Sequence, residues 1–249
     1  MKRQLVSLWV LSALLLASCE SVTEREDPKS FLSIEDVADS KALLGAPPVE
    51  GSAAYQYDVA RYEWGKSQRS TPRGVQAVRD ANLQDTVWMD AAFSEAFGYA
   101  LTPENAPEIV KLIQRMKEDA GDLCTRAAKE GYMRQRPFMV FEEPTSTPQD
   151  DVYLRKNGSY PSGHTAIGWA TALVLAEINP ARQTEILERG LEFGESRVIV
   201  GAHFQSDVDA GRTVASGLVA RLHSDDGFAK QMTKAKIEFA RLRNADKKK

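Results

Sequence analysis

Apolar residues along most of the chain recur every three or four positions, which is the spacing of one face of a helix. The stretch 105–130 shows this through Ile109, Leu112, Ile113, Met116, Ala120, Leu123 and Ala127. The same periodicity predicts helices at 53–70, 74–81, 86–98, 105–130, 163–178, 180–195, 206–223 and 226–243. No segment alternates apolar and polar residues as a half-buried strand would. The pattern therefore predicts an all-α fold.

The helical pattern is interrupted between residues 137 and 161. Several prolines and a glycine stand in this stretch, and both residue types break regular structure. We therefore expect a long loop between two helical halves. Loops of this length in a compact domain are usually functional or disordered.

The first 18 residues have the pattern of an export signal, because Lys2 and Arg3 precede an apolar run at 5–17 that ends in small residues. The run is shorter than the roughly 20 residues of a spanning helix. The end of the leader, Leu16-Ala17-Ser18-Cys19, resembles the lipobox of bacterial lipoproteins, in which the cysteine is acylated and becomes the mature N-terminus. A plain signal peptide cut nearby is the alternative.

Residues 19–37 are polar and charged with little apolar periodicity, and we expect them to form a flexible tether. The remaining stretch, 38–249, has the size of a single domain. The formal net charge of −3 argues against a nucleic-acid-binding surface. The chain has two cysteines, so once Cys19 is acylated or removed, Cys124 has no intramolecular partner and packs as a small apolar side chain.

Three histidines narrow the search for chemistry: His164, His203 and His223. His164 and His203 stand in polar junctions beside serine, glycine or basic residues, whereas His223 ends a helix and is explained as a surface or capping residue. Once His164 and His203 are assigned to chemistry, no cluster of metal ligands remains, and we expect no metal site.

The block 158–165 (GSYPSGHT) leads directly into an apolar helical segment. The first N–H groups of a helix lack intrahelical acceptors and attract anions. Ser162 adds a hydroxyl donor, and Gly163 lets a phosphate approach the backbone closely. Taken alone, the block is also explained as an ordinary capped helix start.

A second block, 196–207 (SRVIVGAHFQSD), places His203 just before a helix. Asp207 falls in the first turn, where its carboxylate can accept the imidazole N–H and fix which ring nitrogen is free. We expect Ser206 and Asp209 to form the capping box of this helix. The alternative is a structural cap with an incidental histidine.

The third block, 129–137 (KEGYMRQRP), is basic, and cations are favoured at helix C-termini for purely electrostatic reasons. Together, however, the three blocks resemble the signature of the PAP2-type phosphatase superfamily: KxxxxxxRP, PSGH and SRxxxxxHxxxD. The full GSYPSGHT resembles more narrowly the class A nonspecific acid phosphatases of bacteria, and the resemblance extends over roughly residues 38–245.

The resemblance implies a compact helical bundle of the acid phosphatase–haloperoxidase type that hydrolyses phosphate monoesters with broad specificity, with no metal and no cofactor. His203 would attack phosphorus and form a phosphohistidine, Asp207 would orient it, and His164 would serve as general acid and then as general base. The groups that would bind the phosphoryl oxygens are Lys129, Arg136, Ser162, Gly163 and Arg197.

Rival functions stay open beside this one. They are a phosphotransferase to nucleoside or sugar hydroxyls, a vanadium haloperoxidase with a similar site, and a non-catalytic lipoprotein on the same fold. The export signal implies a periplasmic or secreted protein, held to the outer membrane only through a lipid on Cys19. The resemblance implies small-molecule phosphate monoesters as substrates, no nucleic-acid partner, and a homodimer or larger homo-oligomer.

Overall fold

The computed structural model describes residues 29–246, and within them it contains helices and no strand, which confirms the all-α prediction. The α-helices are α1 Ser40–Leu44, α2 Ala53–Gln68, α3 Pro72–Asp80, α4 Val87–Phe97, α5 Pro107–Glu118, α6 Arg126–Tyr132, α7 Pro137–Val140, α8 Pro148–Leu154, α9 Gly163–Ile178, α10 Gln183–Ile199, α11 Gln205–Leu222 and α12 Asp226–Asp246. A π-helical turn at Asp119–Leu123 follows α5, and a 3₁₀ turn at Pro180–Arg182 precedes α10.

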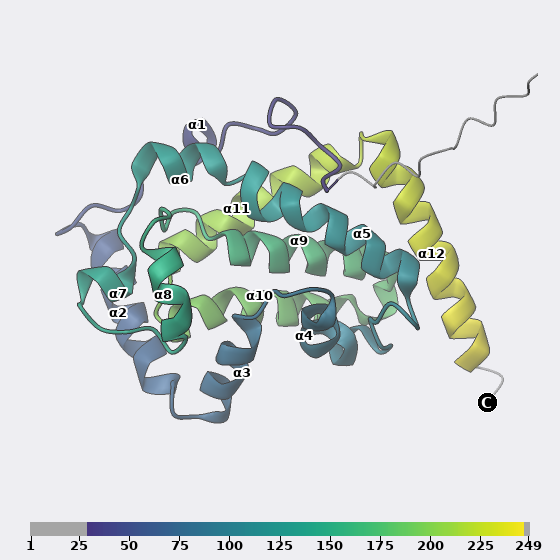
Figure 1. The fold of residues 1–249 in the computed structure, drawn as a ribbon, viewed down its shortest axis with the longest axis horizontal. Helices are drawn as coiled ribbons and strands as arrows, with labels where there is room; N and C mark the ends of the chain where they lie inside the picture. Colours follow the sequence, from purple (N-terminus) through teal and green to yellow (C-terminus); the bar gives the residue numbers. More distant parts are fainter. Residues whose placement is uncertain (1–28, 247–249) are drawn as a thin grey trace, which may run out of the picture.

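Helix α9 lies at the centre of the bundle, packed mainly against α10 and α11, and α12 runs along one end against α5 (Figure 1). Most α9 side chains are buried, as expected of a helix that is apolar on all sides. Glycines allow α9 and α10 to approach closely: a Cβ on Gly190 would stand 2.5 Å from Cβ of Ala172. The core therefore fixes where α9 begins and where α10 ends.

The single helix expected at 105–130 is wrong, because α5 ends at Glu118 and α6 starts only at Arg126. The buried carboxylate of Asp119 accepts backbone N–H groups of Phe31 and Leu32, each at 2.9 Å, at the point where the π-turn begins. Apolar periodicity continues through the break, since the side chains on both sides of it face the same core. Periodicity alone could not reveal the change of helix type.

The unstructured loop expected at 137–161 is also wrong. It contains α7 and α8, and each begins with a proline at its first position, Pro137 and Pro148. Proline breaks a helix in its interior, but its fixed φ and missing N–H suit the first turn. These prolines start helices instead of ending them.

The tether expected at 19–37 is wrong for part of its length. Phe31 and Leu32 are buried in the main core, and Phe31 lies edge-on to Phe228 with the guanidinium of Arg115 over its ring. The chain is thus packed on the bundle several residues before the expected domain start. The leader, Cys19 and residues 20–28 lie outside the described residues.

Smaller differences occur elsewhere. Helix α10 extends to Ile199, four residues beyond the expected end, so that Arg197 occupies its last turn. Cys124 is buried and unpaired, as expected, and burial raises the pKa of its thiol to about 12. Within residues 29–246, no helix has the length and apolar character needed to cross a membrane.

We expect Asp119→Asn to change how stability depends on pH. Burial raises the pKa of Asp119 from 3.8 to about 6, against the opposing effect of the N–H groups of Phe31 and Leu32. Because the folded protein then binds this proton more tightly than the unfolded chain, stability falls as pH rises from about 4 to beyond 6. Urea unfolding should show the stability of wild type relative to the Asp119→Asn variant falling by about 1–3 kcal/mol between pH 4 and pH 7. A difference that stays constant with pH would contradict this.

Candidate active site

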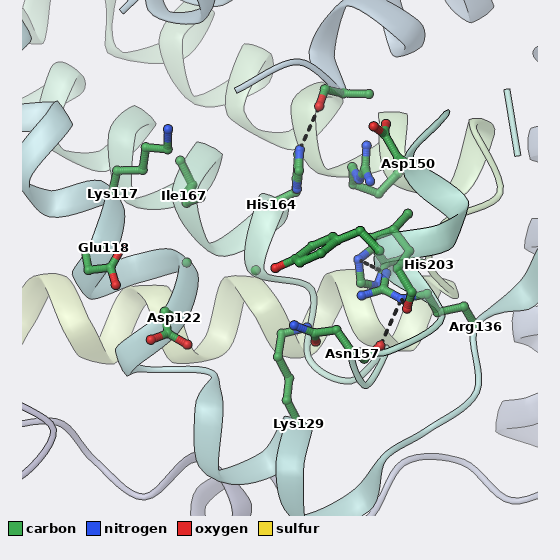
Figure 2. A pocket seen from close by; sticks show the side chains of 16 residues that line it. Lys117, Glu118, Asp122, Lys129, Arg136, Asp150, Asn157, His164, Ile167 and His203 are labelled. Atoms are coloured by element: carbon green, nitrogen blue, oxygen red, sulfur yellow. Dashed lines mark hydrogen bonds between the residues drawn. The ribbon is translucent and has the colours of Figure 1, made fainter. Parts of the chain in front are cut away.

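A pocket of about 470 Å³ opens where α6, α9, α10 and the segment after α8 meet (Figure 2). Six of the eight residues singled out in the sequence line it: Lys129, Arg136, Gly163, His164, Arg197 and His203. Ser162 and Asp207 do not line it and are fully buried. The fold therefore brings the three sequence blocks to one place.

Arg136 is held almost entirely by backbone carbonyl groups. Its Nε donates to the carbonyl oxygens of Leu154 at 3.0 Å and Asn157 at 3.2 Å, and Nη1 donates to that of Ala202 at 3.1 Å. Nη2 donates to the carbonyl oxygen of Gly158 at 3.3 Å. The Arg136 residue is only 2% exposed, so the position and orientation of its guanidinium are fixed before any ligand arrives.

Arg136 also determines which ring nitrogen of His203 carries the proton. Its Nη1 lies 2.9 Å from Nε2 of His203. A guanidinium only donates hydrogen bonds, so Nε2 must accept, and the proton of the neutral ring must be on Nδ1. Nδ1 in turn lies 3.4 Å from Oδ2 of Asp207 and 3.3 Å from Oγ of Ser159. The ring therefore presents an unprotonated Nε2 to the pocket.

The backbone supports this arrangement through the turn between α10 and α11. Gly201 has φ of 83°, a conformation that other residues adopt at a cost, and it reverses the chain after α10. The N–H groups of Ala202 and His203 then both donate to the carbonyl oxygen of Arg197, at 3.1 and 3.2 Å. His203 and Arg197 thus hold each other in place through the main chain.

Asp207 belongs to the cap of α11 as well as to the site. Its Oδ2 accepts the N–H of Phe204 at 2.8 Å and the hydroxyl of Ser159 at 2.5 Å. The capping box expected from Ser206 and Asp209 is wrong, because α11 begins at Gln205 after the N-cap residue Phe204, which makes Asp207 the third helical residue.

His164 stands in the first turn of α9, and its Nε2 lies 3.0 Å from the carbonyl oxygen of Ala81. A carbonyl oxygen only accepts, so Nε2 carries a proton and Nδ1 is the atom that gains or loses one. Burial, followed by the charge of Arg197, holds the pKa of His164 well below its usual value. The unliganded site therefore keeps this imidazole neutral.

Gly163 and Ser162 start α9. The hydroxyl oxygen of Ser162 accepts the N–H and hydroxyl of Thr165, at 3.3 and 3.0 Å, so it serves as the helix cap. The role of Ser162 as a phosphate ligand stays a prediction. A Cβ on Gly163 would lie 2.7 Å from the carbonyl oxygen of Gly121, so the contact with the π-turn requires glycine here.

Lys129, Arg136 and Arg197 lie close together in the pocket, and Lys117 is a fourth basic residue in its lining. Burial and then Arg136 lower the pKa of Lys129 to about 7, and the same two causes lower the pKa of Arg197 to about 10. Burial lowers the pKa of His203 well below its usual value, with Arg136 the next cause. Nε and Nη1 of Arg197 are buried and have no hydrogen-bond partner among the described residues. This part of the site therefore offers hydrogen-bond donors and positive charge that suit an anion, although Glu118, Asp122 and Asp150 also line the pocket.

Sequence reasoning missed several groups around the site. Ser159 stands inside the GSYPSGHT block, and Arg134 stands between Lys129 and Arg136, so both were visible but without an assigned role. Asp58 comes from α2, far away in the sequence, and no local pattern points to it. His223 pairs with Glu177 at 3.0 Å on the surface and ends α11, as expected.

Comparison with known proteins identifies the family of this chain. The model of the PAP2 superfamily matches residues 120–227, which include all three blocks. The chain is 57% identical over 213 residues to a non-specific acid phosphatase of Providencia stuartii, with 86% of each chain covered. It is 42% identical over 217 residues to a non-specific acid phosphatase of Salmonella typhimurium, covering 87% of this chain and 86% of that one. This chain belongs to the PAP2 superfamily, among the non-specific acid phosphatases.

A more distant relative extends the similarity. The chain is 37% identical over 237 residues to an acid phosphatase of Zymomonas mobilis, and the alignment covers 95% of this chain and 88% of the relative. The protein is therefore a phosphatase of the PAP2 family with acid phosphatase activity, built on an all-α fold.

We expect Arg197→Met to stabilise the unliganded acid phosphatase while removing its response to phosphate. Replacing a buried, unpaired charge by an apolar side chain of similar length is often stabilising, here by about 1–2 kcal/mol. Wild type should gain about 2.7 kcal/mol at a phosphate concentration about 100 times its Kd, because the ligand binds only the folded state. Urea unfolding with and without inorganic phosphate measures both effects.

Arg212→Met is the matched control, because Arg212 pairs with Asp209 on the surface and does not line the pocket. It should leave the phosphate response intact. An Arg197→Met protein that is less stable than wild type without phosphate would contradict the claim that Arg197 is electrostatically unsatisfied.

Proposed function

We propose that this acid phosphatase hydrolyses phosphate monoesters of broad structure through a phosphohistidine on Nε2 of His203, without a metal ion. The observation that carries the proposal is the contact between Arg136 Nη1 and His203 Nε2. It leaves an imidazole lone pair directed at a guanidinium, in a pocket that also holds Lys129 and Arg197. The lone pair of the nucleophile and the cations that bind phosphate are therefore adjacent.

In the first step, the phosphoryl oxygens of the substrate take over the donors of Arg136, Arg197, Lys129 and the N–H of Gly163. A phosphate oxygen is a charged acceptor, so it competes well with the neutral ring nitrogen for Nη1 of Arg136. Nε2 of His203 then attacks phosphorus, and the bond from phosphorus to the ester oxygen breaks. The negative charge of the bound substrate favours the protonated imidazole, so Nδ1 of His164 takes up a proton from solvent on binding and then gives it to the departing alcohol.

In the second step, the now neutral His164 takes a proton from water through the same Nδ1. The oxygen of that water attacks phosphorus, the bond to Nε2 of His203 breaks, and inorganic phosphate leaves. Throughout, the ring of His203 keeps its proton on Nδ1, facing Asp207. Two displacements at phosphorus with lower barriers thus replace a single displacement by water with a higher barrier.

The charge distribution supports a metal-independent reaction. Phosphoryl transfer needs positioning and positive charge around the equatorial oxygens. Lys129, Arg136 and Arg197 provide that charge in the pocket. Within residues 29–246, no three His, Cys, Asp or Glu side chains are grouped as ligands for a cation.

Broad specificity follows from where the contacts lie. The fixed donors surround the phosphoryl position, whereas the rim is formed by mixed side chains such as Lys117, Glu118 and the exposed Tyr153. The leader at 1–18 supports export, and we propose that the enzyme acts outside the cytoplasm.

The test compares three single-histidine variants with p-nitrophenyl phosphate at mildly acid pH in the presence of a chelator. His203→Ala should lose activity by at least about a thousandfold and form no acid-labile phosphoenzyme. His164→Ala should still accept the phosphoryl group, because p-nitrophenolate needs little protonation, but should hydrolyse it slowly. Phosphoenzyme should therefore accumulate in the His164 variant, as seen by labelling with radioactive substrate and quenching in alkaline detergent, which preserves the acid-labile P–N bond.

His223→Ala is the control, since His223 lies on the surface and pairs with Glu177. It should behave as wild type, and vanadate should inhibit both. Turnover that the chelator abolishes would contradict metal independence. Phosphoenzyme in the His203 variant would assign the nucleophile to another residue.

The pH dependence should reflect Lys129. Its pKa of about 7 in the free enzyme means that it is charged below neutrality and loses its proton above. The pKa of His203 is well below its usual value, so this ring stays neutral and nucleophilic in mild acid. We therefore expect kcat/KM to be highest on the acid side and to fall as pH rises through about 7.

Lys129→Arg should move this decline to higher pH, because a guanidinium keeps its charge. Steady-state profiles of both enzymes with one substrate separate the effect of Lys129 from ionisation of the substrate itself. A wild-type kcat/KM that still climbs above neutrality would overturn these assignments.

A further inference from the structure

A buried ion-pair triad lies directly behind the proposed nucleophile. Arg134 donates from Nη1 to Oδ1 of Asp207 at 2.6 Å and from Nη2 to Oδ2 of Asp58 at 2.8 Å. Both carboxylates are fully buried, and the side chain of Arg134 is 8% exposed. One cation therefore bridges two anions, of which one, Asp207, faces His203.

Asp58 extends the triad to α2 and is itself well satisfied. Its Oδ1 accepts the N–H of Ser206 at 2.8 Å, and Oδ2 accepts the hydroxyl of Ser206 at 2.6 Å. The guanidinium of Arg134 also stacks over Phe204, 4.3 Å from the ring centre. Helix α2 is thus tied to the first turn of α11 at the point where Asp207 begins its contacts with the site.

The main chain of Arg134 supports the same region. Its carbonyl oxygen accepts the N–H of Ser159 at 2.9 Å, and the hydroxyl of Ser159 donates to Oδ2 of Asp207. Arg134 therefore fixes Oδ1 of Asp207 directly and Oδ2 through Ser159. The carboxylate has little freedom to rotate away from the imidazole.

We infer that Asp58 and Arg134 are positioning residues for the reaction. Through Asp207 they hold the imidazole ring of His203 in its orientation, and they set how much of the positive charge on the phosphorylated ring Asp207 compensates. This inference rests on the proposed function, because it presupposes a phosphohistidine intermediate on His203.

The charged groups around His203 are mostly positive. Arg136 contacts its Nε2, Lys129 and Arg197 line the same pocket and lower its pKa by repulsion, and Ser159 and Asp207 face its Nδ1. His164 adds no negative charge. Asp207 is thus the carboxylate in contact with the ring, and its charge is shared with Arg134. Asp58 draws part of the guanidinium charge to itself and leaves more of the Asp207 charge for the ring.

Asp58→Asn tests this charge effect. Asparagine keeps the shape and one acceptor but removes the negative charge, so Arg134 should neutralise Asp207 more completely. We expect kcat to fall about tenfold with KM changed less than about twofold, because compensation matters in the phosphorylated state. We also expect the acid limb of the kcat/KM profile to move down by about half a pH unit, because a less compensated ring loses its proton more easily.

Arg134→Lys separates geometry from charge. Lysine keeps the positive charge but cannot bridge both carboxylates, so kcat should fall while the acid limb stays in place. This variant also keeps the inference testable if the Asp58→Asn protein fails to fold. Phosphate-dependent thermal stabilisation of each variant shows whether the pocket still forms.

Glu238→Gln is the matched control. Glu238 on α12 accepts the N–H groups of Glu108 and Ile109, and α12 and α2 lie at opposite ends of the molecule (Figure 1). The substitution should alter neither kcat nor the acid limb, whatever it does to stability. A folded Asp58→Asn enzyme with the kcat or the acid limb of wild type would overturn the inference, and so would wild-type kcat in the Arg134→Lys enzyme.

Trapping of the phosphoenzyme in wild type distinguishes a failure of the proposed function from a failure of the role assigned to Asp58 and Arg134. If wild type forms no phosphohistidine, the proposed function fails and this inference with it. If wild type forms the phosphohistidine but the Asp58 and Arg134 variants keep their kcat, only the role of the triad fails.

Discussion

Mutual repulsion among Lys129, Arg136 and Arg197 is the constraint on which the rest of the site depends. Burying cations costs free energy. Pairing each of them with a carboxylate would reduce this cost, but it would also cancel the positive charge of the pocket. The structure instead surrounds Arg136 with carbonyl oxygens of Leu154, Asn157, Gly158 and Ala202. These dipoles lower the cost of burial without cancelling the charge. The pocket therefore keeps a net attraction for an anion.

Such a site needs a rigid scaffold, because charged groups that repel would separate if they could. The close packing of α9, α10 and α11 provides it by fixing the start of α9 and the end of α10, from which His164 and Arg197 emerge. The end of α8 and the segment after it supply three of the carbonyl groups around Arg136, and the turn between α10 and α11 supplies that of Ala202. Core packing thus holds in place an arrangement of charges that is locally unfavourable.

The sequence predicted those features of the fold and the site that depend on short stretches of the chain. Periodicity identified α9 and α11, and the three blocks identified six of the residues that line the pocket. Prediction from sequence failed where a contact with a segment far away in the sequence determines the local structure. Asp119 ends the α5 pattern by binding the backbone of residues 31 and 32, and Asp58 reaches the site from α2. Pro137 was misinterpreted because a proline that starts a helix and one that ends it look alike in sequence.

In the reaction proposed above, the contact between Arg136 and His203 links substrate binding to activation of the nucleophile. In the free enzyme the guanidinium occupies the lone pair of Nε2, which protects the ring from protonation and holds it in place. A phosphoryl group that enters the pocket offers Arg136 a charged oxygen in exchange for a neutral nitrogen, and this exchange releases the lone pair toward phosphorus. On this proposal, Nε2 of His203 becomes available only when cations already neutralise the oxygens of the phosphoryl group that it attacks. Binding energy for the phosphoryl group is thereby used to bring the reacting atoms together, whatever alcohol the phosphate carries.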